Sequence, residues 1–284
     1  MTLCSNRADI FFGSARPVVR VVLSRVRGSS PREAGTEMFV SQDSLLGTIG
    51  GGHLEHIAIT QARTMLAEGT LSSKLDLPLG PEIGQCCGGR VELTLTRMRR
   101  ADRQAVMNRL QADEDALPHV YVMGAGHVGR AIANLLQHAP VHCVLVDMRK
   151  EELAQCEARV DMRLRAIPEV EIYNAPQGSA FIVLTHDHGL DFLLSSAALE
   201  LGHAAYVGMI GSATKRAKLR SWCNSHCNGL SIDRLTCPIG ATQSRDKRPE
   251  IIAAFVAAEV LTALTTGARA SGGTEETVLL HAAQ

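Results

Sequence analysis

The stretch from His119 to Asp147, "HVYVMGAGHVGRAIANLLQHAPVHCVLVD", constrains the fold more than any other part of the sequence. A short apolar strand is predicted to run directly into Gly124, Gly126 and Gly129, where a helix begins. A second apolar strand then ends at Asp147, 23 residues after Gly124. This order of strand, Gly-x-Gly-x-x-Gly, helix, strand and acidic residue is typical of a Rossmann unit.

These residues have separate mechanical roles in such a unit. Gly124 allows the tight turn after the strand, Gly126 lets a pyrophosphate approach the backbone, and Gly129 lets the helix pack against the strand. Free N–H groups at the start of the helix favour an anion, and Asp147 can accept a hydrogen bond from a ribose hydroxyl. We therefore expect a nucleotide such as NAD(P) at this loop. The alternative is a Rossmann domain that has lost its ligand, because a fold does not fix a function.

Strands and helices continue to alternate after this unit. Apolar strands are predicted in residues 179–187 ("SAFIVLTHD") and 203–211 ("HAAYVGMIG"). The alternation predicts an α/β fold with a Rossmann-like, doubly wound, mostly parallel sheet over about residues 118–240. A helix near 248–266 is expected to pack on this sheet or on the other domain. Ligands of such sheets bind beyond the carboxyl ends of the strands. The candidate nucleotide-binding residues are therefore Gly124, Gly126, His127, Gly129, Asp147, Gly208, Gly211 and Ser212, of which Ser212 equally fits a helix N-cap.

The N-terminal third of the chain follows a different pattern. Short strands alternate with glycine-rich turns, and "LLGTIGGGHLEHIAITQARTMLAEG" runs from such a turn into one helix that Gly69 closes. We expect a smaller N-terminal α+β domain at residues 1–98 and a charged, helix-prone linker at 99–117. The Rossmann-like domain with its C-terminal helix then covers 118–270, and a weakly ordered tail covers 271–284.

Composition excludes some classes of partner. The 29 basic side chains equal the 29 acidic ones, whereas a nucleic-acid-binding protein would show a basic stripe. Eight cysteines without regular spacing, and no secretory leader at "MTLCSNRADI", predict a cytoplasmic protein. The longest apolar stretch, "IIAAFVAAEVLTALTTGA", carries Glu259 and fits a buried helix better than a membrane span.

Two adjacent cysteines, Cys86 and Cys87, stand in "LGPEIGQCCGGRVEL" between glycine-rich turns. Neighbouring Cα atoms lie about 3.8 Å apart, whereas an unstrained disulfide needs roughly 4.4–6.8 Å. The pair is therefore expected to present thiols to a ligand. The alternative is that one of the two points into the core, because adjacent residues in extended backbone face opposite sides.

Other metal-ligand patterns are weaker. His186, His188 and Asp191 in "THDHGLD" resemble the metal loop of metallo-β-lactamase-type hydrolases, but the aspartate comes one position late and no histidine follows it. Cys223 and Cys227 are spaced as neighbours on a helix and are expected to be ordinary thiols.

Seven motifs in one order give the chain a resemblance to a known family. They are "GSSPREAGTEMFV", "GTIGGGHLE", "LGPEIGQCCGGRVEL", "GAGHVGRA", "THDHGLD", "YVGMIGSATKR" and "CPIG". On these motifs the chain resembles the XdhC/CoxI family of xanthine dehydrogenase accessory proteins, over nearly all of its length outside the two tails. One departure is the stretch "ATQSRDK" (241–247), where the family has a glycine- or isoleucine-bearing turn.

The resemblance implies a maturation chaperone in purine catabolism, not an enzyme. Such proteins bind molybdopterin-type molybdenum cofactor, support its sulfuration with a cysteine desulfurase, and insert it into the molybdenum-binding subunit of xanthine dehydrogenase. A homo-oligomer is expected, with no nucleic-acid or membrane partner. Thiolates suit a soft metal and loop N–H groups suit phosphate. The implied cofactor-binding residues are Arg32, Gly50, Gly51, Gly52, His53, Glu55, Cys86, Cys87, Gly88 and Gly89, with the molybdenum on Cys86 or Cys87.

Two other classes of function stay open at this point. The Rossmann unit also suits an NAD(P)-dependent oxidoreductase, although no Tyr-x-x-x-Lys and no clear acid–base pair follow it. Two glycine-flanked cysteines also suit a thiol or persulfide redox sensor.

Overall fold

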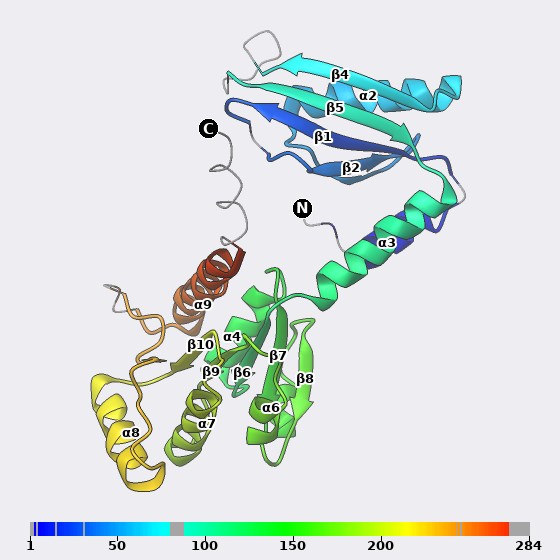
Figure 1. Ribbon diagram of the computed structural model, residues 1–284. Helices are drawn as coiled ribbons and strands as arrows, with labels where there is room; N and C mark the ends of the chain where they lie inside the picture. Colours follow the sequence, from blue (N-terminus) through cyan, green and yellow to red (C-terminus); the bar gives the residue numbers. More distant parts are fainter. Residues whose placement is uncertain are drawn as a thin grey trace, which may run out of the picture. The chain divides into compact units, whose positions relative to one another are not determined.

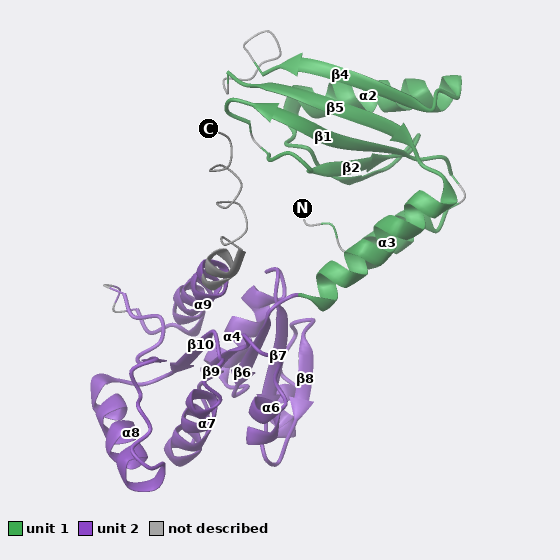
Figure 2. Ribbon diagram, viewed as in Figure 1, with its two compact units in different colours: residues 1–116 green, residues 117–284 purple. Residues whose placement is uncertain are grey.

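The chain forms two compact units, residues 1–116 and 117–284 (Figure 2). The computed structural model describes residues 3, 5–14, 16–30, 32–79, 88–242, 244 and 246–272. Helix α3 (Arg100–Asp115), which the sequence predicts as a linker between domains, is counted with the first unit. Most of the C-terminal tail expected from residue 271 lies outside the described residues, and helix α9 (Pro249–Gly272) runs into its first two positions.

Unit 1 is built on an antiparallel sheet with the strand order β3-β2-β1-β5-β4 (Figure 1). Its strands are β1 (Val19–Arg27), β2 (Glu37–Val40), β3 (Leu45–Gly47), β4 (Ser72–Pro78) and β5 (Arg90–Arg97). Helix α2 (Gly52–Glu68) covers one face, because its apolar residues recur at helical spacing and meet the inward-facing residues of the strands. The buried helix positions are Leu54, Ala58, Ala62 and Met65.

Helices α1 (Ser5–Phe12) and α3 cover part of the other face of this sheet. Val106 and Leu110 of α3 are buried against strand residues such as Phe39. A buried carboxylate also ties α3 to the sheet: Glu37 is 5% exposed, accepts from Arg20 Nε at 2.7 Å, and pairs with Arg109 of α3. Although most residues of α3 are charged or polar, the helix has a narrow apolar face that packs on the sheet.

Unit 2 has a six-stranded parallel sheet with the order β11-β10-β9-β6-β7-β8. Read from β8 to β11, with β6 counted as strand 1, this is the 3-2-1-4-5-6 order of dinucleotide-binding folds. The predicted Rossmann-like sheet is confirmed. The strands are β6 (His119–Met123), β7 (His142–Asp147), β8 (Asp161–Leu164), β9 (Ala180–Val183), β10 (Tyr206–Met209) and β11 (Leu235–Thr236).

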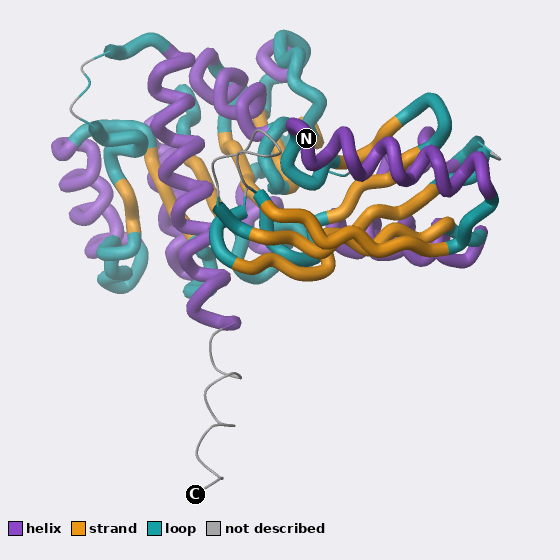
Figure 3. Tube along the Cα trace, turned by 90° about the horizontal axis from the view of Figure 1, so that it is seen from above, coloured by secondary structure: helices purple, strands orange, loops and turns teal. Residues whose placement is uncertain are grey.

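Helices lie on both sides of the unit 2 strands (Figure 3). Apolar residues alternate between the two faces of each strand: Val120 and Val122 of β6 belong to one core cluster, and Tyr121 and Met123 to the other. The helices are α4 (His127–Leu136), α5 (Lys150–Leu153), α6 (Glu169–Tyr173), α7 (His188–Glu200), α8 (Ala213–His226) and α9.

Helix α9 packs beside α4 and buries Ala253, Val256 and Val260 in the core of unit 2. Within the described residues it is the one helix that is long and apolar enough to cross a membrane by length and composition, a test that core helices also pass. Its Glu259 accepts from the Tyr206 hydroxyl and from Gly240 N at 3.1 Å. These two bonds attach the helix to β10 and to the "CPIG" turn.

Candidate functional site

Three glycine-rich segments of unit 1 follow strands that run toward the same end of its sheet. Strands β1 and β4 both pair antiparallel with β5, and β3 pairs antiparallel with β2, so β1, β3 and β4 all run toward the end where β5 begins (Figure 1). The segments that follow these strands are 28–36 after β1, 48–52 after β3 and 79–89 after β4, and of the last one Leu79, Gly88 and Gly89 are described. The sequence predicts one site from these segments, and the topology gives the three strands that lead into them the same direction.

The base of the cysteine loop is held by backbone hydrogen bonds. Leu79 N donates to Gly89 O at 2.7 Å, and Gly88 N donates to Leu79 O at 2.8 Å. Ser29 forms a bridge with Gly88, and a Cβ on Gly89 would clash with the Ser29 carbonyl oxygen. Gly89 is therefore explained by packing. Cys86 and Cys87 lie outside the described residues, so their thiol–metal contact stays a prediction.

The loop before α2 contains three consecutive glycines with positive φ, namely Gly50 at 131°, Gly51 at 79° and Gly52 at 65°. Other residues rarely adopt such angles, so the loop path depends on glycine. A Cβ on Gly51 would meet no atom within 4 Å, and the same holds for Gly88 in the segment before β5. Both positions therefore leave open surface beside exposed backbone, which suits a phosphate group.

Glu55, a predicted cofactor contact, is hydrogen-bonded to the glycine loop itself. Its Oε2 accepts from Thr48 Oγ1, from Ile49 N at 3.3 Å and from Gly51 N at 3.1 Å. The carboxylate thus fixes the glycine loop from the first turns of α2 and uses one amide that was expected to face phosphate. An incoming phosphate has to bind the other loop amides or displace this carboxylate.

The two remaining predicted side chains of this site are exposed. Arg32 lies in the turn after β1, where its backbone N donates to Ser30 Oγ at 3.4 Å. His53 lies in the first turn of α2, and its ring is 6.3 Å from that of His56. Arg32 is thus a solvent-exposed cation in the segment after β1.

In unit 2, two of the three loop glycines are required by the fold itself. Gly124 has φ of 131°, and a Cβ there would lie 2.5 Å from the Leu184 carbonyl oxygen. A Cβ on Gly129 would clash with the carbonyl oxygen of Gly124. Gly126 differs, because its φ of −66° suits any residue and a Cβ would meet nothing within 4 Å. Packing within the chain therefore gives no reason for glycine at 126.

Asp147 is hydrogen-bonded to the backbone of this glycine loop. It is buried, and it accepts from Ala125 N at 2.7 Å and from Arg149 N, Nε and Nη2 at 2.9–3.0 Å. Burial alone would raise its pKa, but the hydrogen bonds from Arg149 and the Ala125 amide outweigh burial and hold the pKa below its usual value. Both carboxylate oxygens are in use, so a ribose hydroxyl has to share them with Arg149 or displace it.

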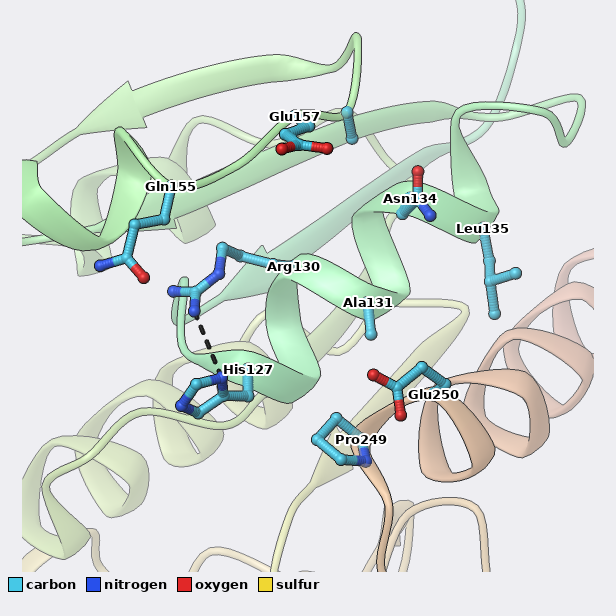
Figure 4. A pocket seen from close by; sticks show the side chains of 10 residues that line it. His127, Arg130, Ala131, Asn134, Leu135, Gln155, Glu157, Pro249 and Glu250 are labelled. Carbon is cyan, nitrogen blue, oxygen red and sulfur yellow. Dashed lines mark hydrogen bonds between the residues drawn. The ribbon is translucent and has the colours of Figure 1, made fainter.

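His127 lies beside a groove of about 340 Å³ on the outer side of α4 (Figure 4). Its Nδ1 is 3.4 Å from Arg130 Nη2, and Arg130 also pairs with Glu152 and donates to Ala125 O. Glu157 and Glu250 line the same groove. Because the carboxylates offset the arginine, the groove does not favour an anionic ligand.

The predicted glycines Gly208, within β10, and Gly211, just after it, both lie against side chains of the chain itself. A Cβ on Gly208 would clash with the Tyr206 hydroxyl, and one on Gly211 would lie 2.7 Å from Lys215 Cδ. Ser212 Oγ accepts from Lys215 N at 3.3 Å, so the predicted N-cap of α8 is confirmed. Packing thus explains both glycines.

The sequence reasoning missed a buried ion pair at the same edge of the sheet. Lys215 Nζ pairs with Asp191, whose other oxygen accepts from Thr185 N and Oγ1, both at 2.8 Å. Asp191 is therefore not available as the metal ligand that "THDHGLD" suggests, and no metal-binding group of three His, Cys, Asp or Glu occurs among the described residues. The missed signal was a lysine in the first turn of a helix, where the helix dipole disfavours a cation.

Comparisons with known proteins agree with this architecture. A family model described as the XdhC Rossmann domain matches residues 120–260, and a model described as the XdhC and CoxI family matches residues 13–74. A crystal structure described as a xanthine dehydrogenase from Bacillus halodurans matches with a TM-score of 0.76, over 93% of this chain and 96% of that chain. At 17% sequence identity this likeness shows the fold alone. A comparison with curated proteins gave no significant match.

Proposed function

The chain belongs to the XdhC and CoxI family, whose members are accessory proteins linked to xanthine dehydrogenase, and we propose that its unit 1 binds molybdenum cofactor for delivery to that enzyme. In this proposal the protein acts in the cytoplasm, as a homo-oligomer, and supports sulfuration of the cofactor by a cysteine desulfurase. The molybdenum-binding subunit of xanthine dehydrogenase then receives the cofactor. The purified chain alone is expected to show no turnover of xanthine.

The observation that carries the proposal is that β1, β3 and β4, which lead into segments 28–36, 48–52 and 79–89, all run toward the same end of the unit 1 sheet. The family resemblance assigns cofactor contacts to these segments, which are far apart in the sequence. A single binding site needs them on the same side of the sheet, and the common direction of the three strands supports the proposal.

The chemistry of the three segments is complementary to the two ends of the cofactor. The loop at Gly50–Gly52 and the exposed Arg32 suit the phosphate end, because backbone amides and a guanidinium both bind phosphate oxygens. A thiolate of Cys86 or Cys87 suits the soft, sulfur-rich metal end. Glu55 keeps the loop in its glycine-dependent shape through three hydrogen bonds.

The test is cofactor binding by the double variant Cys86→Ser, Cys87→Ser. Serine keeps the size but replaces a soft sulfur by a hard, protonated oxygen, so cofactor affinity and activation of apo-xanthine dehydrogenase are both expected to fall. Arg32→Gln tests the phosphate end in the same two assays. A double variant that folds, binds cofactor at wild-type affinity and activates the enzyme contradicts the proposed metal contact.

The matched control is Cys143→Ser in β7. Burial raises the pKa of the Cys143 thiol to about 12, so this sulfur stays protonated and inside the core of unit 2. Its replacement is expected to lower stability while cofactor affinity stays unchanged. Loss of cofactor binding in this variant shows that the assay reports unfolding and not the contact.

A further inference from the structure

Strand β8 forms one edge of the unit 2 sheet, and exposed apolar side chains gather around it (Figure 1). Eleven large apolar side chains of the described residues are exposed, and six of them lie between residues 148 and 173. Single exposed apolar residues are normal, whereas a group of them marks an interaction surface. The six, with exposed fractions from 45% to 63%, are Met148, Met162, Leu164, Ile167, Val170 and Tyr173.

The outer side of β8 also has backbone groups that are free to pair. Strand β7 pairs with β8 on one side, and no strand of the described residues pairs with it on the other. Arg165 N donates to Asp147 O of β7 at 3.0 Å, so the backbone of Arg165 points toward β7. Successive strand residues point to alternate sides, so the N–H and C=O groups of Met162 and Leu164 point outward. Such an edge is a template for pairing with another chain.

The two faces of β8 differ in chemistry. Met162 and Leu164 lie on one face, because alternate residues of a strand share a side. Asp161 and Arg163 lie on the opposite face. There Arg163 Nη2 is 2.6 Å from Asp161 Oδ2, and Arg163 also pairs with Glu171 of α6. The edge therefore presents an apolar row on one face and two opposite charges on the other.

This sequence is complementary to itself when two copies pair antiparallel around a two-fold axis. With the axis at Met162, Asp161 of each copy lies opposite Arg163 of the other, and the neighbouring Val160 lies opposite Leu164. The charged face then pairs opposite charges and the apolar face pairs apolar residues, and both kinds of cross-strand pair are stabilising.

The other positions of the axis within β8 set like charges opposite each other. An axis at Asp161 opposes two carboxylates, and an axis at Arg163 opposes two guanidinium groups. An axis at Leu164 opposes Arg163 to Arg165. Because like charges directly opposite each other are destabilising, the charge pattern selects the axis at Met162.

Backbone and helix contacts support the same position. Since the backbone of Met162 points outward, the two copies of Met162 form a hydrogen-bonded pair, and Asp161 and Arg163 fall at the neighbouring pairs, where side chains approach more closely. Four strand residues alone bury less than the roughly 1,200–2,000 Å² of a stable interface. Ile167, Val170 and Tyr173, in and just before α6, recur every three residues and supply exposed apolar area beside the axis.

We propose that two copies of this chain associate through β8 and α6, with their β8 strands paired antiparallel around a two-fold axis at Met162. The two six-stranded sheets then form one continuous sheet. This interface is the contact surface of the homo-oligomer in the proposed function, and it rests on no residue of unit 1.

The first experiment measures the mass of the full-length protein by size-exclusion chromatography with light scattering over a dilution series. The wild-type chain is expected to be a dimer. Met162→Lys places two ammonium groups at the axis and removes two apolar side chains from the interface, so the dissociation constant of the dimer should rise at least about tenfold. Because Met162 is 46% exposed in the single chain, folding is spared. Leu135→Lys on α4, at a residue 41% exposed, is the matched control and should leave the dimer unchanged.

The second experiment tests the position of the axis by cross-linking. The Cα atoms of a hydrogen-bonded antiparallel pair lie about 5.5 Å apart, within the roughly 4.4–6.8 Å that a disulfide spans. Met162→Cys is therefore expected to give a covalent dimer on a non-reducing gel after oxidation with diamide. Leu164→Cys is the control, because the two copies of residue 164 are offset by about 14 Å along the strands. The wild-type chain, which has eight cysteines, gives the background.

Four results overturn the proposal. A wild-type protein that is monomeric at every concentration excludes the interface and the homo-oligomer together. A dimer that folded Met162→Lys leaves intact, or that Leu135→Lys dissociates, excludes the interface while the homo-oligomer stands. Cross-linking of Leu164→Cys as efficient as that of Met162→Cys excludes the axis at Met162. Failure of cofactor binding by unit 1 changes none of these measurements.

Discussion

Alanine at each of the three loop glycines of unit 2 gives a quantitative test of which glycine serves the fold and which serves a ligand. Gly129→Ala places a methyl group against the Gly124 carbonyl oxygen and 3.0 Å from Leu184 Cδ1. Helix α4 must then move away from the sheet, and overpacking of this kind typically costs about 1–3 kcal/mol. Since one of the colliding atoms belongs to the backbone, we expect about 3 kcal/mol.

Gly124→Ala combines two penalties. A residue with a side chain at a φ of 131° is strained by about 1–3 kcal/mol, and its Cβ meets the Leu184 carbonyl oxygen at 2.5 Å. We therefore expect a loss of at least about 3 kcal/mol, close to that of Gly129→Ala.

Gly126→Ala is expected to be nearly neutral. Alanine fits the φ of −66° and the open space, and its smaller unfolded-state entropy stabilises by about 0.4–1 kcal/mol. Gly126 is also the N-cap of α4, where alanine is less favourable than glycine by a similar amount. The two effects offset each other, so the free energy of unfolding should stay within about 0.5 kcal/mol of wild type.

The assay is urea unfolding followed by tryptophan fluorescence. The chain has a single tryptophan, Trp222, and it lies in α8 of unit 2 beside Phe192 and His226, so its signal reports this unit. Linear extrapolation then gives the change in unfolding free energy for each variant. A loss at Gly126→Ala as large as that at Gly129→Ala would refute the distinction between a packing glycine and a ligand glycine.

Three further predictions follow from buried polar groups. Hydrogen bonds keep the pKa of Asp147 low, so its contribution to stability is complete above the unfolded-state pKa and disappears as the pH falls through the folded-state pKa. Asp147→Asn should therefore lower the free energy of unfolding at neutral pH and weaken its decrease at acidic pH, as followed by Trp222 fluorescence. Glu37→Gln should lower the free energy of unfolding of unit 1 by about 1–3 kcal/mol, which circular dichroism can follow. We expect the low end of this range because its partners Arg20 and Arg109 are 36% and 44% exposed. Cys143→Ser should lower stability by about 1–3 kcal/mol because it buries a hydroxyl group, and Trp222 fluorescence can follow the change. Wild-type stability of this variant would contradict the position of Cys143 in the core.

The sequence predicted the elements whose signal is local. Strand, glycine loop and helix follow each other within about thirty residues in a Rossmann unit, and the parallel sheet of unit 2 came from repetition of that pattern. The roles of Gly124 and Gly129 were also readable, because the turn and the close packing of helix on strand are fixed by the motif itself. In unit 1 the three motif segments could be read from the sequence, whereas the common direction of the strands that lead into them required the strand order.

What the sequence could not supply was the partner of each polar side chain. Residues 99–117 look like a linker because charges dominate them, whereas α3 buries Val106 and Leu110 and sends Arg109 to Glu37, a residue 72 positions earlier. Glu55 and Asp147 were assigned to ligands from their residue type and position. Both are acceptors for nearby backbone amides in the structure. The ion pair of Lys215 could not be predicted from local sequence, because its partner Asp191 is on a different helix.

The two units share one structural feature: a carboxylate, Glu55 in unit 1 and Asp147 in unit 2, accepts hydrogen bonds from a glycine loop and orders it without a ligand. A loop that is already ordered loses less conformational entropy on binding, which strengthens affinity. The same carboxylate repels an anionic ligand, and the two units differ in how this repulsion is offset. Asp147 carries its own cation, Arg149, whereas Glu55 has no ion-pair partner within the described residues. In the proposed site a phosphate at the unit 1 loop therefore depends on a cation from another segment, and the exposed Arg32 in the turn after β1 is a candidate for it.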